Sequence, residues 1–162
     1  MKSTQRMPAL FLSHGSPMMA LEHSQTTEFF KKLSDKFPEP KAIVIFSAHY
    51  DRRGPVTITS GHTLGTIHDF YGFPKPLYDI DYSAKGAPEL AQKAAKLLQD
   101  AGISAQLDSN QGLDHGAWIP MLYMYPQKNV PIIQVSINSY MDAVSHYEIG
   151  RWLRPLGKEG VL

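Results

Sequence analysis

Residues 42–50, Ala-Ile-Val-Ile-Phe-Ser-Ala-His-Tyr, constrain the fold more than any other stretch of the chain. They open with five consecutive apolar residues, which are too few for a typical helix and which follow Pro38 and Pro40. Such a run predicts a central β-strand that is buried on both faces. Because His49 lies near its end, we expect this imidazole at the carboxyl end of the strand, where open α/β sheets place their ligands.

A shorter segment, residues 8–13, is built in the same way. Its apolar residues lead into a turn that contains His14, Gly15 and Pro17. Residues 24–37, between the two segments, carry apolar side chains at helical spacing. We therefore predict a strand, a helix and a second strand joined by a right-handed crossover, with the two strands parallel and adjacent. This arrangement would place His14 opposite His49.

The rest of the chain continues the alternation of strands and helices. We expect further strands at residues 56–59, 103–107 and 130–137, and helices at residues 87–101 and 142–156. Between them, residues 112–120 should form a turn that leads into a short helix ending at Tyr125. In the last helix we expect the inward-facing side chains to be Val144, Tyr147, Trp152, Leu153 and Leu156. The pattern is typical of a single α/β domain over residues 1–162, with a mostly parallel central sheet flanked by helices on both faces. Residues 160–162, Gly-Val-Leu, look like the start of a strand, so we expect the last strand or strands of the sheet to be missing.

The composition narrows the classes of function. Lys and Arg number 16 against 15 Asp and Glu, a net charge of +1, which argues against a nucleic-acid or acidic-membrane partner. There is no cysteine, so a metal would have to be held by histidine and carboxylate side chains. Residues 1–6 are not followed by the apolar stretch of a secretory signal, and no run approaches the ~18 apolar residues of a membrane span. We expect a cytoplasmic protein.

Two of the seven histidines are candidate metal ligands. His14 and His49 each follow an apolar segment in a Ser-His or Ser-Ala-His turn, and imidazole is the commonest metal ligand. The alternative is that both are loop histidines bonded to nearby backbone. Their equivalent places in the predicted sheet give the two interpretations about equal weight.

His115 is a candidate general base. It lies between two glycines, which let the backbone approach a ligand closely, and a neutral imidazole takes up a proton near pH 7. The alternative is a helix-capping turn in which Asp114 caps and His115 is incidental. For His68, packing among the neighbouring aromatic side chains is the favoured interpretation, and a ligand role for His68 or Asp69 is a weak alternative.

Four segments carry a family resemblance: residues 11–19 (Phe-Leu-Ser-His-Gly-Ser-Pro-Met-Met), 47–50 (Ser-Ala-His-Tyr), 69–74 (Asp-Phe-Tyr-Gly-Phe-Pro) and 112–118 (Gly-Leu-Asp-His-Gly-Ala-Trp). In this order they resemble the DOPA-type class III extradiol ring-cleavage dioxygenases. The resemblance implies a catalytic domain, incomplete at its C-terminus, that opens the ring of DOPA or a similar small catechol with O₂. It also implies that His14 and His49 bind a non-haem Fe(II), often replaced by Zn(II) in purified protein, that His115 is the acid/base residue, and that further ligands follow residue 162.

Two other functions remain open at this point. One is a zinc-dependent hydrolase that uses the same site. The other is a truncated, non-catalytic protein that retains the fold and a weak metal site. The sequence does not indicate the oligomeric state.

Overall fold

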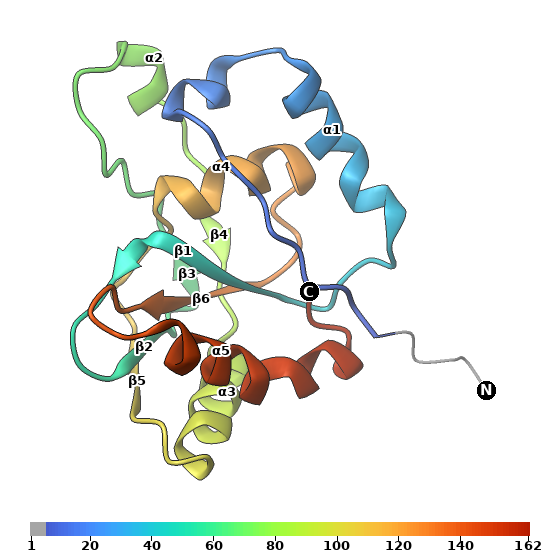
Figure 1. Ribbon diagram of the computed structural model, residues 1–162. Coiled ribbons are helices and arrows are strands. Elements are labelled where there is room, and N and C mark those ends of the chain that lie inside the picture. Colours follow the sequence, from blue (N-terminus) through green and yellow to red (C-terminus); the bar gives the residue numbers. More distant parts are fainter. Residues whose placement is uncertain (1–5) are drawn as a thin grey trace.

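The computed structural model describes residues 6–162 and has helices on both sides of a small sheet (Figure 1). The sheet contains four strands in the order β1-β6-β2-β5. Their bounds are Ile43–Asp51 for β1, Val56–Thr59 for β2, Ala105–Asp108 for β5 and Ile132–Ile137 for β6. β1 pairs with β6 and β2 with β5 in parallel, whereas β2 and β6 are antiparallel. The predicted single α/β domain with a mostly parallel central sheet is confirmed.

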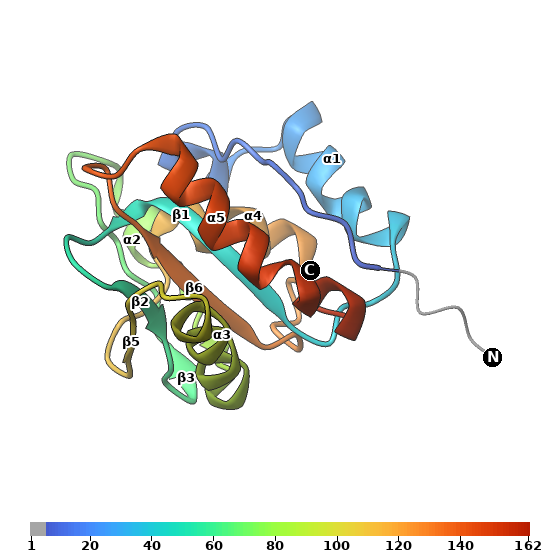
Figure 2. The ribbon, with the colours of Figure 1, turned by 60° about the horizontal axis from the view of Figure 1, so that its bottom comes forward.

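The helices divide between the two faces of the sheet (Figures 1 and 2). One side carries η1 (Pro17–Leu21), α1 (Gln25–Leu33), η2 (Ser34–Lys36), α2 (Lys75–Tyr78) and α4 (His115–Met124); the other carries α3 (Pro88–Asp100), α5 (Ala143–Leu153) and η3 (Arg154–Glu159). A two-stranded ribbon of β3 (Thr63–Leu64) and β4 (Ala84–Lys85) contributes Leu64 and Ala84 to the core that the first group covers. Within residues 6–162 no helix combines the length and apolar character that a bilayer crossing requires. The expectation about a secretory signal involves residues 1–5, which lie outside the described residues.

Strand β6 joins two hydrophobic cores because its side chains alternate between the faces of the sheet. Ile132 packs into the core beneath α1 and α4, whereas Ile133 and Val135 pack into the core beneath α3 and α5. Gln134 is completely buried on the same face as Ile132 and donates a hydrogen bond to Asp114 at the start of α4. Burying each of these aliphatic side chains stabilises the fold by about 1.5–3 kcal/mol. Because β6 contributes such side chains to both cores, both layers of helices depend on this strand.

Strand β1, predicted to be central and buried on both faces, is an edge strand with a partly exposed face. Phe46 is 44% exposed. β6 pairs along one side of β1, and on the other side only its first residues are paired. The Val44 N–H donates to the Leu162 carbonyl at 2.8 Å and the Leu162 N–H donates to the Ala42 carbonyl at 3.0 Å. Val161 thereby forms a parallel bridge with Ala42, which agrees with the expected strand start. That further strands follow remains a prediction.

The predicted strand over residues 8–13 is absent, and with it the predicted crossover unit. Residues 6–15 form an irregular extended segment that crosses in front of α4 (Figure 1). Its apolar run is not a buried strand, since Phe11 is fully exposed and only Leu12 packs against the core. At the start of β1 the edge of the sheet is bonded to Val161 and Leu162 and not to residues 8–13. The segment is instead held by a backbone hydrogen bond from Met7 to Gly157 at 2.9 Å.

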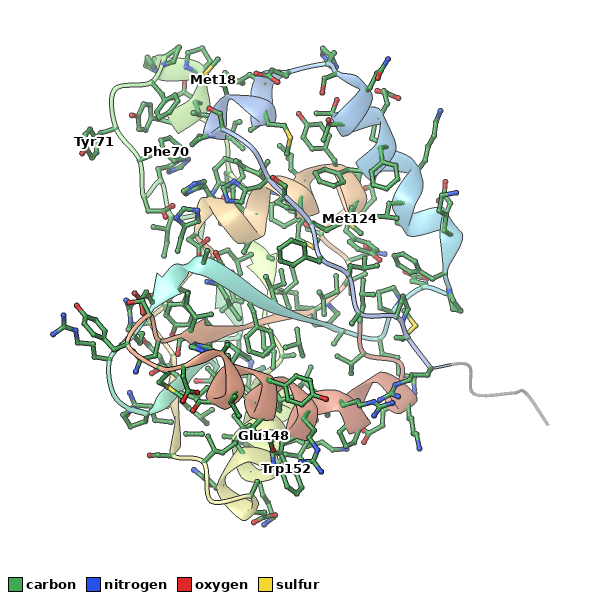
Figure 3. The ribbon with its side chains drawn as sticks, viewed as in Figure 1. Met18, Phe70, Tyr71, Met124, Glu148 and Trp152 are labelled. Atoms are coloured by element: carbon green, nitrogen blue, oxygen red, sulfur yellow. The ribbon has the colours of Figure 1, made fainter. Side chains whose placement is uncertain are left out.

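The face that α5 turns to the sheet also differs from the prediction. Leu153 and Leu156 are buried as expected, together with Ile149. The other three side chains predicted to be inward are exposed: Val144 and Tyr147 at 70% each, and Trp152 at 41% (Figure 3). Apolar residues lie on both sides of this helix, so spacing alone did not identify the side that packs on the sheet.

Candidate metal centre

Three histidines from separate parts of the chain meet at one end of β1. His14 ends the extended segment before η1, His49 lies on β1, and His115 is the first residue of α4. The Nε2 atoms of His14 and His49 are 3.1 Å apart, and the ring centroid of His115 is 4.9 Å from that of His14 and 4.0 Å from that of His49. One nitrogen from each ring lies within 4.8 Å of the others. The predicted meeting of His14 and His49 therefore occurs without the predicted pair of parallel strands.

The buried carboxylate of Asp114 holds the elements that carry two of these histidines. It caps α4 by accepting backbone N–H groups of the first turn at 2.9 and 3.3 Å. It also accepts hydrogen bonds from the Ser47 hydroxyl at 2.6 Å and from Gln134 Nε2. The Ser47 Oγ in turn accepts the backbone N–H of His49 at 3.2 Å. Asp114 thus caps α4, as the helix-capping interpretation predicted. His115 nevertheless faces the other two histidines, as its interpretation as a site residue predicted.

His115 is held from behind by the loop of residues 66–74. Its Nδ1 lies 2.8 Å from Asp69 Oδ1, and the same oxygen accepts its backbone N–H at 3.0 Å. Burial raises the pKa of the Asp69 carboxyl, but the hydrogen bonds from His115 outweigh this effect and lower the pKa overall. The ring of Phe70 meets that of His115 edge-on at 5.6 Å. Tyr71, the next residue of this loop, is 93% exposed and points away from the molecule (Figure 3).

His68 has the packing role that was favoured for it. Its ring contacts those of Phe70, Tyr78 and Trp118, with centroids 5.7, 6.0 and 5.9 Å away. Its Nε2 lies 3.0 Å from the carbonyl oxygen of Ile80, to which it donates. His68 is therefore part of the wall behind the site and does not join the three-histidine group.

The three-histidine group fits a divalent first-row metal ion. Two nitrogens bound at about 2.1 Å to one ion lie about 3.0 Å apart in octahedral and about 3.4 Å apart in tetrahedral geometry. The observed 3.1 Å between His14 and His49 falls in that interval. His14 Nδ1 is buried without a hydrogen-bond partner among the described residues. Burial and then the neighbouring His115 and His49 lower the pKa of His14, which favours the neutral imidazole that metals bind.

Residues 8–160 match the model of a protein family, the catalytic LigB subunit of aromatic ring-opening dioxygenase. The chain belongs to this family. It is 47% identical over 161 residues to the 4,5-DOPA dioxygenase extradiol of Escherichia coli K12, with 99% of this chain and 58% of that protein covered. It is 43% identical over 158 residues to the 4,5-DOPA dioxygenase extradiol of Beta vulgaris, with 94% and 58% covered.

A solved structure supports the same relationship within the LigB family. The crystal structure of an uncharacterized protein from Escherichia coli K12 matches this fold with a TM-score of 0.70 and 36% sequence identity, covering 86% of this chain and 51% of that chain. The chain thus spans little more than half the length of the relatives that it matches. The ring-opening activity of a whole LigB protein is therefore not assigned to it by similarity alone.

Sequence reasoning missed the residues that surround the histidines of this LigB domain. Ser47 and Gln134 lie on different strands from Asp114, and their hydrogen bonds to it follow from the strand order β1-β6 beneath α4. Asp69 was considered only beside His68, as a weak alternative ligand, but its partner is His115, 46 residues away. No spacing in the chain indicates these long-range pairs.

Gly116 lets β1 and α4 approach closely in this LigB domain, and we predict that Gly116→Ala disturbs the site. An added Cβ would lie 2.5 Å from Ser47 Oγ and 2.8 Å from His49 Cδ2. We expect the free energy of unfolding to fall by about 1–3 kcal/mol and metal binding to weaken, because His49 must move. Urea unfolding and metal titration measure both effects.

The matched control is Gly150→Ala on α5, where no heavy atom lies within 4 Å of the added Cβ. This change should raise the free energy of unfolding by about 0.5–1 kcal/mol, since alanine is the better helix former, and should leave metal binding unchanged. Equal effects of the two substitutions would contradict the close approach at Gly116.

Proposed function

We propose that this chain forms the metal-binding and acid/base part of a non-haem Fe(II)-dependent extradiol dioxygenase that opens the ring of DOPA or a similar small catechol with O₂. The observation that carries the proposal is the convergence of His14, His49 and His115 at one point of a LigB-family fold. The names of the relatives, 4,5-DOPA dioxygenase extradiol, support the choice of substrate.

In this proposal the histidines have two roles. His14 and His49 would hold the ion, and a bound Fe(II) would supply a Lewis acid for the catechol oxygens and the electrons that activate O₂. The same two imidazoles suit Zn(II), which we expect in purified protein. His115 takes a proton from a catechol hydroxyl and returns one during ring opening. Phe70, edge-on to His115, offers an apolar surface for the substrate ring.

Loss of either proposed ligand should weaken metal binding. For His14→Ala and His49→Ala we expect a loss of affinity beyond the ~10–100-fold typical of changes around a ligand, because a bond to the ion itself is removed. Anaerobic calorimetric titration with Fe(II), and separately with Zn(II), measures the affinity. His62→Ala, in an exposed loop, is the control and should bind metal like the unchanged chain. Unaltered affinity in both ligand variants would refute the proposed site.

Ring opening is tested directly with DOPA, Fe(II) and air. We expect one O₂ consumed per catechol and a coloured product whose mass equals that of the catechol plus O₂. Hydrolysis that needs zinc and consumes no oxygen would instead favour a hydrolase. A folded chain that binds no metal at micromolar concentration would favour a non-catalytic remnant.

A further inference from the structure

We propose that Asp69 is the positioning residue of this site, because it fixes which nitrogen of His115 faces the metal and the substrate. The inference rests on the proposed function and adds a residue to it. One carboxylate oxygen, Oδ1, contacts both the ring Nδ1 of His115 at 2.8 Å and its backbone N–H at 3.0 Å. The two contacts hold the ring and the first residue of α4 to the same point.

The contacts define the state of the imidazole. A backbone N–H always donates, so Asp69 Oδ1 is an acceptor toward it. An ionised carboxylate has no hydrogen to donate, and the ring nitrogen 2.8 Å away must therefore donate to it. The hydrogen of neutral His115 then sits on Nδ1, and its lone pair sits on Nε2. A base that removes a catechol proton needs this free lone pair.

The contact with Asp69 distinguishes His115 from His14 and His49. His14 and His49 face each other through their Nε2 atoms, and His14 Nδ1 has no partner among the described residues. His115, whose side chain is 7% exposed, is held by a carboxylate that is itself 26% exposed. A carboxylate behind an imidazole fixes its orientation and its tautomer. Asp69 thus leaves Nε2 of His115 as the nitrogen that can accept a proton.

The loop that carries Asp69 is anchored independently of this contact. The Ile67 N–H donates to the Leu113 carbonyl at 2.8 Å, and the Ile67 carbonyl accepts the indole N–H of Trp118 at 3.0 Å. Phe70 also packs on Phe73, with ring centroids 5.4 Å apart. Replacing the Asp69 carboxylate should therefore leave the loop in place and change only the hold on His115.

The first test reads the imidazole directly and requires no catalysis. In the metal-free chain labelled with ¹⁵N-histidine, long-range ¹H–¹⁵N spectra at mildly alkaline pH should show His115 as the Nδ1–H form. Asp69→Asn should shift it to the Nε2–H form or to a mixture, because an amide can present an N–H to the ring. Asp79→Asn is the matched control, since Asp79 pairs with Lys75 on the surface and should leave His115 unchanged. A predominant Nε2–H form in the unchanged chain, or no shift in Asp69→Asn, would overturn the proposal.

The second test uses the Fe(II)-loaded chain and DOPA. Asp69→Asn should lower kcat by about 10–100-fold and change KM for the catechol much less, because His115 is misoriented while His14 and His49 remain. Asp69→Glu should recover part of kcat if its carboxylate reaches Nδ1. An equal loss in kcat and in Fe(II) affinity would show a merely structural role and refute positioning. If no ring opening is detected in the unchanged chain, the spectra still decide the positioning, and only the proposed function fails.

Discussion

Replacing His115 with glutamine should abolish most ring opening while leaving the ion in place. A general base of the kind proposed for His115 contributes about 10²–10⁴-fold to the rate, so His115→Gln should reduce kcat by that factor. Fe(II) affinity should change only a few-fold, because His14 and His49 are untouched. Steady-state oxygen uptake with DOPA, with anaerobic Fe(II) titration of the same samples, measures both quantities.

The outcome also decides between two readings of the three-histidine group. All three rings lie close enough to share one ion, so His115 is geometrically able to be a third ligand. If His115→Gln loses Fe(II) as severely as His14→Ala, the acid/base assignment is wrong. His146→Gln provides the control, because the partly exposed His146 is not in the three-histidine group; it donates to the Asp142 carbonyl through Nδ1 and accepts the Asn138 N–H through Nε2. It should leave Fe(II) affinity and kcat unchanged.

The local sequence was sufficient for most elements of the fold. The β-branched run of β1 and the alanine- and leucine-rich stripe of α3 follow from side-chain shape and periodicity, which act within a few residues. The failures concern relations between elements. Residues 8–13 have the composition of a strand, yet no edge of the sheet beside them is free at the start of β1, where Val161 and Leu162 are bonded.

The candidate site was predictable where a histidine lay at the point where one periodic segment of the sequence ends or another begins. His14, His49 and His115 were recognised as candidates because each lies near the end or the start of an element. The sequence did not predict the contacts that Ser47 and Gln134 make with Asp114, or that Asp69 makes with His115. These contacts form only when α4 is placed over β1 and β6. A buried carboxylate gives no sign of its burial in a polar Gly-Leu-Asp-His-Gly sequence.

Asp114 is the residue whose loss should most destabilise the fold. It is 2% exposed, caps α4 and accepts hydrogen bonds from Ser47 and Gln134. Asp114→Ala removes the cap and leaves the buried amide of Gln134 and the N–H groups of α4 without an acceptor. We expect the free energy of unfolding of the metal-free chain to fall by about 3–5 kcal/mol, a large part of a typical total of about 5–15 kcal/mol. Urea unfolding monitored by circular dichroism measures the loss.

Asp142→Ala is the matched control, because Asp142 also caps a helix, accepting the Ser145 N–H at 2.7 Å, but is exposed to water. Its loss should cost about 1 kcal/mol, the usual value for an exposed cap. The difference between the two substitutions is the contribution of the buried network beneath the histidines. If Asp114→Ala does not fold, Asp114→Asn, which keeps one acceptor oxygen, should fold with an intermediate loss of about 1–3 kcal/mol. Equal losses at positions 114 and 142 would mean that Asp114 acts only as a cap and that the network does not hold β1, β6 and α4 together.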